Sequence, residues 1–365
     1  MKNTIELQHH QRIFGLDILR AYAIIVVVAS HGRYLVGDTF LYEFPYFVPV
    51  DGVDLFFVLS GFLIGTILLK EISVTNVFNG AQLLTFWKRR WLRTLPNYYL
   101  ILLINFLLIK LSFVPDTLEH FDWKFLFFLQ NFSSSFSWFF VESWSLSIEE
   151  WFYIFAPLIL LITLKFLTIK KAFIVTVLTL IIVPFFIRSF ISDPTVIDWS
   201  WVDAEIKKVV VTRIDAIGYG LLAAWIAFYY SDFWKKYRFV FLAIGLAMHF
   251  ILDMLNSYTH YFYVQVIYYS LAPALAFMFL PIAHGFQKTE GIVVKAITFI
   301  SKISYSMYLV NLSIVAAVMK MNFPVVNTMD GTIKYVLYWI IVIGLSSIIY
   351  RYFEKPIMNL RNKFS

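Results

Sequence analysis

The stretch from Leu16 to Arg33, LDILRAYAIIVVVASHGR, combines the length and apolar character of a membrane-spanning helix with ionisable side chains. Its apolar run, with the flanking residues, is long enough to cross a hydrocarbon core of ~30 Å. Arg20 and His31 are 11 residues apart, which at ~100° per residue places both on one helix face, roughly 16 Å apart along the axis. Such a face is costly in lipid, so the pattern predicts that it looks into a protein interior or a wet cavity. Snorkelling at the two helix ends is the alternative, and it explains the shared face less well.

The composition is that of a membrane protein. Hydrophobic residues make up 60% of the 365 residues and charged residues only 15%, against about 25% charged residues in soluble domains. The many Phe, Tyr and Trp residues are typical of aromatic belts at membrane interfaces. The absence of cysteine excludes a cysteine nucleophile, a disulfide framework and a thiolate metal site. The net charge of +7 is interpreted through the loops that carry it, and neither a nucleic-acid partner nor a metal is expected.

Ten apolar segments are long enough to span a membrane, so the chain is predicted to be an all-α polytopic membrane protein. When the connecting segments alternate between the two sides, the basic residues fall mainly on one side, and this places both termini in the cytoplasm. No signal peptide or soluble domain is evident, so we expect a single membrane domain over residues 1–365 without a fused extracellular domain. The expected spans cover residues 16–34, 52–69, 95–113, 144–164, 172–191, 209–229, 239–255, 263–283, 301–319 and 333–352.

Two other segments have amphipathic or aromatic patterns. Residues 71–94 are expected to lie on the inner membrane surface, ahead of the third span. Residues 123–132 are expected to form a short interfacial helix or a re-entrant segment.

A basic tract with arginines at 89, 90 and 93 precedes Pro96 at the inner entrance to the third span. Arg90 and Arg93 are one turn apart, and paired arginines are suited to bidentate recognition of phosphate. Pro96 suits a helix start or a kink. Topology alone would explain Lys88 and one arginine. We therefore predict an inner basic cluster of Arg20, Arg89, Arg90 and Arg93 that binds an anionic cytosolic ligand.

Acidic side chains gather toward the outer side. Asp54, near the outer end of the second span, is either a carboxylate hydrated by headgroup water or a partner that orients the His31 imidazole. Glu149 and Glu150 open the fourth span, after Ser145 or Ser147 as a possible helix cap. Adjacent residues point ~100° apart, so only one glutamate is expected to face the interior, and which one stays open.

The sixth span adds Arg213 and Asp215, either near the site or as an ion pair that seals the bundle. In the ninth span, Tyr308 and Asn311 commonly serve as hydrogen-bonding links between helices. Three glycines of the second span, Gly52, Gly61 and Gly65, are expected to allow close helix packing. Together these residues predict basic groups inside and acid–base groups outside: His31, Asp54 and Glu149, with Arg213 and Asp215 nearby.

Seven motifs in this order resemble the membrane-bound acyltransferase-3 family, whose members O-acetylate bacterial surface and periplasmic glycans. They are R-x10-H from Arg20, GVDLFFVLSGFLI from Gly52, RRxxRxxP from Arg89, WSLxxEExFY from Trp144, RxDAxxxG from Arg213, SYxxYL from Ser304 and ExP from Glu354. The resemblance covers nearly the whole chain. It departs from the family at Asn311, where a histidine is often found.

The resemblance implies a multi-pass protein of the bacterial cytoplasmic (inner) membrane, surrounded by lipid, with acetyl-CoA as the cytosolic acyl donor. The implied acceptor is a hydroxyl group of an envelope carbohydrate such as O-antigen or peptidoglycan. Roles carried over by position make His31 the catalytic base with support from Asp54 and Glu149, and the inner arginines the donor-binding residues. The acceptor is then expected near Trp144, Tyr308, Asn311, Arg213 and Asp215.

Two chemical routes and two rival functions stay open at this point. His31 either removes a proton from the acceptor hydroxyl during direct transfer or forms an acyl-histidine intermediate. Intramembrane Arg, His and Asp also occur in proton-coupled transporters and exporters, and an envelope scaffold is a weaker alternative. The sequence does not fix the acceptor, the acyl chain length or the oligomeric state.

Overall fold

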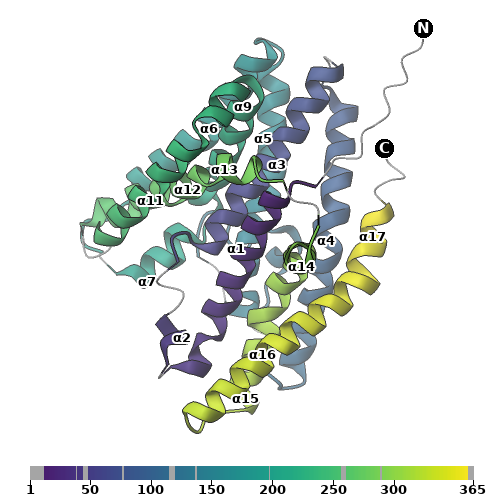
Figure 1. The fold of residues 1–365 in the computed structure, drawn as a ribbon, viewed down its shortest axis with the longest axis vertical. Helices are drawn as coiled ribbons and strands as arrows, with labels where there is room; N and C mark the ends of the chain where they lie inside the picture. The colour runs from purple at the N-terminus through teal and green to yellow at the C-terminus, as the bar shows by residue number, and fades with distance from the viewer. Residues whose placement is uncertain are drawn as a thin grey trace.

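The computed structural model describes residues 12–360 apart from 38, 44–47, 76–77, 115–119, 136–137, 197, 256–259 and 288–289. Regular structure in this part of the chain is helical, and ten helical segments are long and apolar enough to cross a membrane (Figure 1), which confirms the predicted fold class. The spans consist of α1 (Phe14–Gly32), α3 (Gly52–Thr75), α4 (Gly80–Lys110), α5 (Ser143–Thr163), α6 (Ile169–Ile191), α8 (Val210–Arg213) with α9 (Asp215–Tyr229), α11 (Arg238–Leu255), η7 (Tyr263–Ile267) with α12 (Tyr268–Met278) and α13 (Leu280–His284), α14 (Ile292–Val310) with η8 (Asn311–Ala316) and α15 (Ala317–Asn322), and α16 (Thr328–Ile349) with η9 (Tyr350–Glu354) and α17 (Lys355–Leu360).

Short helices occupy the connections between spans. They are η1 (Arg33–Val36), α2 (Phe40–Glu43), η4 (Trp123–Phe127), η5 (Trp138–Phe140), α7 (Trp199–Val202), η6 (Asp203–Lys207) and α10 (Ser231–Lys236). The helix expected over residues 123–132 is thus limited to the single 3₁₀ turn of η4.

Helix α1 lies between two groups of helices. On one side it packs on α3, and on the other on α14 (Figure 1). Leu16 and Ala23 belong to the hydrophobic core shared with α3, α5, α6 and α9, whereas Ile24 and Val28 belong to the core shared with α4, α14 and α16. The helix that carries Arg20 and His31 is therefore the common wall of both cores.

Helices α3 and α9 approach each other closely because glycines face each other across the contact. A Cβ atom on Gly61 would lie 2.0 Å from the carbonyl oxygen of Ile217, and one on Gly220 would lie 2.0 Å from that of Val58. Backbone atoms cannot yield to a new side chain, so glycine is required at both positions. The predicted role of the second-span glycines in close packing is confirmed.

Helix α4 differs from the prediction. It begins at Gly80, where the Asn79 side chain accepts from the N–H groups of Ala81 and Gln82 and the Gln82 side chain caps in return. This capping box starts one helix of 31 residues. Residues 80–94 are therefore the first part of the third span and not a separate surface segment. Pro96 lies inside the helix and not at its start.

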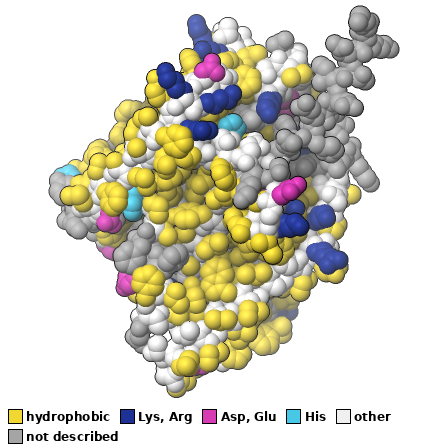
Figure 2. Space-filling view, viewed as in Figure 1, with side chains coloured by type: hydrophobic (Ala, Val, Ile, Leu, Met, Phe, Trp, Pro, Cys, Tyr) yellow, Lys and Arg dark blue, Asp and Glu magenta, His cyan; other side chains and the backbone are white. Residues whose placement is uncertain are grey.

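The outer surface of the bundle is apolar, as expected for helices that face lipid. In the 18-residue apolar stretch of α11, only 11% of the residues are buried inside the protein. In the corresponding stretch of the segment that contains α16, the share is 22%. Figure 2 shows hydrophobic side chains over most of one face, with Lys and Arg gathered toward its upper and right-hand margins. Because the candidate spans among the described residues are even in number, the first begins and the last ends at the same end of the bundle.

Candidate active site

A cavity lies inside the bundle, where five helices meet. Its walls come from α1, α3, α4, α5 and α14, and it combines basic, hydroxyl and aromatic side chains. The lining residues are Arg20, Val53, Phe56, Phe57, Leu59, Ser60, Leu63, Ile64, Arg90, Arg93, Thr94, Ser145, Leu146, Glu149, Tyr153, Ser304, Tyr305 and Tyr308.

Three arginines of the predicted basic cluster line this cavity. Arg20 comes from α1, and Arg90 and Arg93 come from consecutive turns of α4. Arg89 is not among the lining residues, because a neighbouring position on a helix points ~100° away. The expected cluster therefore forms with three of its four members.

The charges around Arg20 leave this region strongly basic. Arg12 and Arg93 repel its guanidinium, while Asp17 and Glu149 attract it. Asp17 is already engaged, since its carboxylate accepts from Arg12 Nε at 2.5 Å and from Ser301 Oγ at 2.8 Å. Among the described residues that line the cavity, Glu149 provides the carboxylate. The cavity thus has the character of an anion-binding site.

Glu149 and Glu150 lie differently from the prediction. Because α5 begins at Ser143, Glu149 is six residues, or roughly 9 Å, inside the helix. Glu149 lines the same cavity as the arginines and is an electrostatic neighbour of Arg20, whereas it is not among the electrostatic neighbours of His31. Glu150 is also directed into the protein, where it is buried and accepts from Thr94 Oγ1 at 2.5 Å. The expectation that only one of the two faces the interior is wrong.

The early start of α5 also changes the roles of its serines. Neither Ser145 nor Ser147 caps the helix, which begins after Glu142 without a side-chain cap. Ser145 Oγ instead lies 2.6 Å from the Tyr308 hydroxyl of α14, at the cavity wall. Tyr308 is therefore both a lining residue and a link between helices.

His31 is held by Asn311. The imidazole Nδ1 lies 2.5 Å from Asn311 Oδ1. The orientation of the amide is fixed, because its Nδ2 donates to the carbonyls of Met307 at 2.9 Å and Tyr308 at 2.7 Å. Since Oδ1 can only accept, Nδ1 of His31 is the donor, and the neutral imidazole carries its lone pair on Nε2. A histidine that acts as a general base through Nε2 needs this tautomer, in which Nε2 is unprotonated and can accept a proton.

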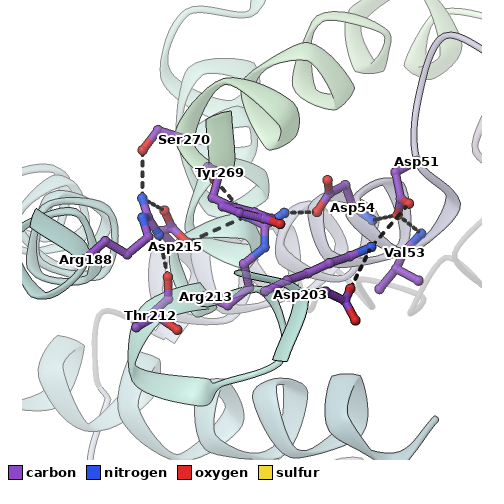
Figure 3. Close-up of polar contacts among 11 residues, drawn as sticks. Asp51, Val53, Asp54, Arg188, Asp203, Thr212, Arg213, Asp215, Tyr269 and Ser270 are labelled. Carbon is purple, nitrogen blue, oxygen red and sulfur yellow. Dashed lines mark hydrogen bonds and ion pairs between the residues drawn. The ribbon is translucent and has the colours of Figure 1, made fainter. Parts of the chain in front are cut away.

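Asp54 does not take the predicted place beside His31. It forms an ion pair with Arg213, whose Nη1 also donates to the carbonyl of Tyr269 at 2.7 Å (Figure 3). Asp54 is buried near the outer end of α3, and the buried guanidinium across from it compensates its charge. The neutral amide of Asn311 occupies the orienting position instead.

The sixth-span pair belongs to a buried ion-pair network. Asp215 forms an ion pair with Arg188 Nη2 of α6 at a distance of 2.7 Å, and Arg213 Nη1 lies 3.9 Å from the same carboxylate (Figure 3). Arg188, Arg213 and Asp215 are fully buried. This is the geometry of the sealing ion pair, and neither Arg213 nor Asp215 lines the cavity. The sequence analysis did not single out Arg188 as their partner.

Charged residues of the outer connections surround the other side of His31. Lys207, Asp51 and Lys208 are its electrostatic neighbours. Lys207 Nζ lies 3.9 Å from Asp51 and 3.8 Å from Asp203. Burial alone would raise the pKa of Asp51, but Lys207 and two backbone N–H groups lower it. His31 therefore lies close to a charged outer rim.

Trp144, another predicted substrate contact, packs edge-on against Phe57, with ring centroids 5.9 Å apart. It is buried and is not among the residues that line the cavity. Glu354, from the last of the seven motifs, accepts from Ser306 Oγ at 2.6 Å and Asn97 Nδ2 at 2.9 Å, and Arg93 is an electrostatic neighbour.

Glu142 is a buried acid that the sequence analysis missed. It precedes α5, and its Oε1 accepts from Ser313 Oγ at 2.7 Å and from the Ser313 N–H at 3.2 Å. Its Oε2 has no hydrogen-bond partner within the described ranges. Burial raises the pKa of Glu142 to about 7, although the Ser313 bonds oppose this. An acid before a helix gives no sequence signal of a partner 171 positions away.

A family model described as an acyltransferase domain matches residues 13–351. The chain therefore belongs to the acyltransferase-3 family, as the motifs indicated.

Individual relatives carry related names. A protein of Staphylococcus aureus (strain COL) named putative O-acetyltransferase is 28% identical over 94% of this chain. The peptidoglycan O-acetyltransferase of Listeria monocytogenes is 33% identical over 43% of the chain and 25% of its own length. The chain spans about half (56%) of the length of the S. aureus relative. No solved structure matches the chain significantly.

Proposed function

We propose that this protein transfers an acetyl group from acetyl-CoA to a hydroxyl group of a cell-envelope glycan. Family membership and the names of the relatives support O-acetyl transfer. The observation that carries the proposal is that one cavity joins three arginines to a hydroxyl-rich wall ending at Tyr308. Tyr308 lies three residues before the asparagine that holds His31.

In this proposal Arg20, Arg90 and Arg93 bind the phosphates of the donor, because guanidinium groups recognise phosphate oxygens in bidentate fashion. The pantetheine arm extends along Ser60 and Tyr153, whose hydroxyls lie 3.2 Å apart, toward Tyr308. Neither His31 nor Asn311 lines the cavity, so the proposal requires the thioester to pass beyond Tyr308 to reach His31.

Transfer follows from the tautomer of His31. Nε2 of His31 removes the proton of the acceptor hydroxyl, and the hydroxyl oxygen attacks the carbonyl carbon of the thioester. The carbon–sulfur bond breaks, and the departing thiolate takes the proton back from Nε2. An acyl-histidine route would use the same nitrogen as nucleophile. Asn311 would hold the ring in either case.

We assign the end of the bundle that carries the basic side chains, at the upper and right-hand margins of Figure 2, to the cytosol. Both termini are then cytoplasmic, and His31 lies toward the outer face of the bacterial cytoplasmic membrane. Asp51, Lys207 and Lys208, the charged neighbours of His31, are suited to hydrogen bonding with sugar hydroxyls at the acceptor side. The relatives named for peptidoglycan make that polymer the first acceptor to test.

The test uses the purified protein in lipid nanodiscs with acetyl-CoA and peptidoglycan fragments, and mass spectrometry detects a gain of one acetyl group. Wild type is expected to acetylate the fragments, and His31→Ala to lose this activity while keeping its thermal stability. Acetylation by His31→Ala at the wild-type rate would contradict the mechanism.

The same preparation separates an enzyme from a transporter. Acetyl-CoA is expected to raise the unfolding temperature of the protein, because a ligand that binds only the folded state stabilises it. The absence of this shift, together with the absence of product, would favour the transporter interpretation instead.

A further inference from the structure

Glu142 lies outside the seven motifs, yet it is one of the most deeply buried acids, with 1% of its surface exposed. Its surroundings are hydroxyl and phenol groups: Ser313 of η8, and Tyr308 and Tyr338 as electrostatic neighbours on α14 and α16. Its carboxylate accepts twice from one residue, so it is oriented toward that residue.

The hydrogen bonds around Ser313 have a definite direction. Asn105 Nδ2 of α4 donates to Ser313 Oγ at 3.0 Å. Ser313 must then use its own hydroxyl proton for Glu142 Oε1, because an amide nitrogen can only donate. The chain Asn105, Ser313, Glu142 therefore joins α4, η8 and the start of α5.

Ser313 and Asn311 belong to the same π-helical turn, η8, where the regular helical hydrogen-bonding pattern is interrupted. Because only one residue separates them, fixing Ser313 fixes the backbone from which the Asn311 side chain projects. Asn311 in turn determines which nitrogen of His31 carries the proton.

The carbonyl of Glu142 anchors the same region a second time. The Tyr308 hydroxyl donates to it at 3.2 Å, and Ser145 Oγ lies 3.4 Å from it. Tyr308 is also one of the carbonyl partners of the Asn311 amide. Glu142 thus contacts the Asn311 turn from both ends, through Ser313 and through Tyr308.

We propose that Glu142 is a positioning residue: through Ser313 it holds the η8 turn so that Asn311 keeps His31 protonated on Nδ1. Its contribution to catalysis rests on the proposed function, whereas its effect on the tautomer does not. Glu142 acts without touching either substrate.

The test measures the tautomer directly. The protein is labelled with histidine carrying ¹⁵N at Nδ1 and studied by solid-state NMR in lipid bilayers, with His31 assigned by its loss in His31→Gln. Wild type is expected to show a protonated Nδ1. Glu142→Ala and Ser313→Ala are expected to shift His31 toward an unprotonated Nδ1. Glu142→Gln keeps an accepting oxygen and is expected to match wild type.

Ser347→Ala is the matched control, because Ser347 donates only to the Ile343 carbonyl of its own helix. Its spectrum is expected to be unchanged. An Nδ1 signal identical to wild type in both Glu142→Ala and Ser313→Ala overturns the proposal, as does an unprotonated Nδ1 in wild type. If Glu142→Ala does not fold, Ser313→Ala decides alone.

Kinetics supply the second readout. Glu142→Ala and Ser313→Ala are each expected to lower kcat by about 10- to 100-fold, with the KM for acetyl-CoA within about 2-fold of wild type. The double variant is expected to be no slower than the slower single variant, because both changes break one chain. Additive losses would overturn the proposal. A wild type with a protonated Nδ1 but no transferase activity would refute the proposed function and leave the positioning role intact.

Discussion

The amide of Asn311 faces the imidazole of His31 with its oxygen, because both of its N–H bonds point at backbone carbonyls of its own helix. A carboxylate in this place would attract a positive imidazolium, whereas the neutral amide fixes the ring without adding charge. The protein thus obtains a defined His31 tautomer from a neutral asparagine.

Replacing Asn311 removes this restraint. Asn311→Ala is expected to lower kcat by about 10- to 100-fold, in line with the loss of an orienting partner, and to leave the KM for acetyl-CoA near its wild-type value. Steady-state acetylation assays measure both constants. Asn322→Ala, which removes an amide that bonds only to backbone carbonyls at the exposed end of the same span, is the control. Full activity of Asn311→Ala would show that His31 needs no orientation.

The arginine tract contains its own control. Arg93→Ala removes a guanidinium that lines the cavity, and a charged hydrogen bond is worth about 1.5–3 kcal/mol. We therefore expect the KM for acetyl-CoA to rise by about 10- to 100-fold. Arg89→Ala removes the same charge from outside the cavity lining and is expected to change this KM little. Equal effects of the two changes would mean that general charge, and not the cavity, attracts the donor.

The buried network of Arg188 and Asp215 is expected to stabilise the fold and not to bind substrate. Arg188→Ala leaves the buried Asp215 carboxylate with only the 3.9 Å contact to Arg213, which is already paired with Asp54, and is expected to cost about 3–5 kcal/mol, measured by thermal unfolding in detergent. The double change Arg188→Met with Asp215→Leu removes both charges and should be less damaging. A stable Arg188→Ala protein with a raised acceptor KM would indicate a substrate role for this network.

Glu142 gives folding a defined pH dependence. Its pKa of about 7 in the folded protein exceeds the ordinary value of 4.5, so the folded state binds more protons between these values. Stability from this group is complete below pH 4.5 and is lost as the pH rises through about 7, by about 3 kcal/mol at most. The unfolding temperature should therefore fall as the pH rises from about 5 to about 8, a range that covers most of the interval between the two pKa values. This fall is expected to be smaller in Glu142→Gln. A decline of the same size in Glu142→Gln would assign it to another group.

Local periodicity accounts for what could be predicted from the sequence. The pairing of Arg90 with Arg93 depends only on helical spacing, and both line the cavity together with Arg20. His31, which is predicted to share the face of Arg20, does not line this cavity. The packing glycines and the ten spans likewise follow from short-range patterns.

The partners of the polar residues could not be predicted, because they come from distant parts of the chain. Asn311 lies 280 positions from His31, and Arg213 lies 159 positions from Asp54. In the sequence, Arg188 looks like a basic residue that only marks the end of a span. Its pairing with Asp215 becomes visible only when α6 is seen packed beside α9. The place of Glu149 beside the arginines depends on how α1 and α4 pack against α5, which no local sequence pattern reveals.

The paired glycines of α3 and α9 have a mechanical consequence for the cavity that we propose binds the nucleotide donor. With backbones in direct contact at Gly61 and Gly220, these two helices form a rigid half of the enclosure. Helices α4 and α14 meet through longer polar side chains such as Asn97 and Ser306. We therefore expect any widening of the cavity during turnover to involve movement of α4 and α14, while α3 keeps its place against α9.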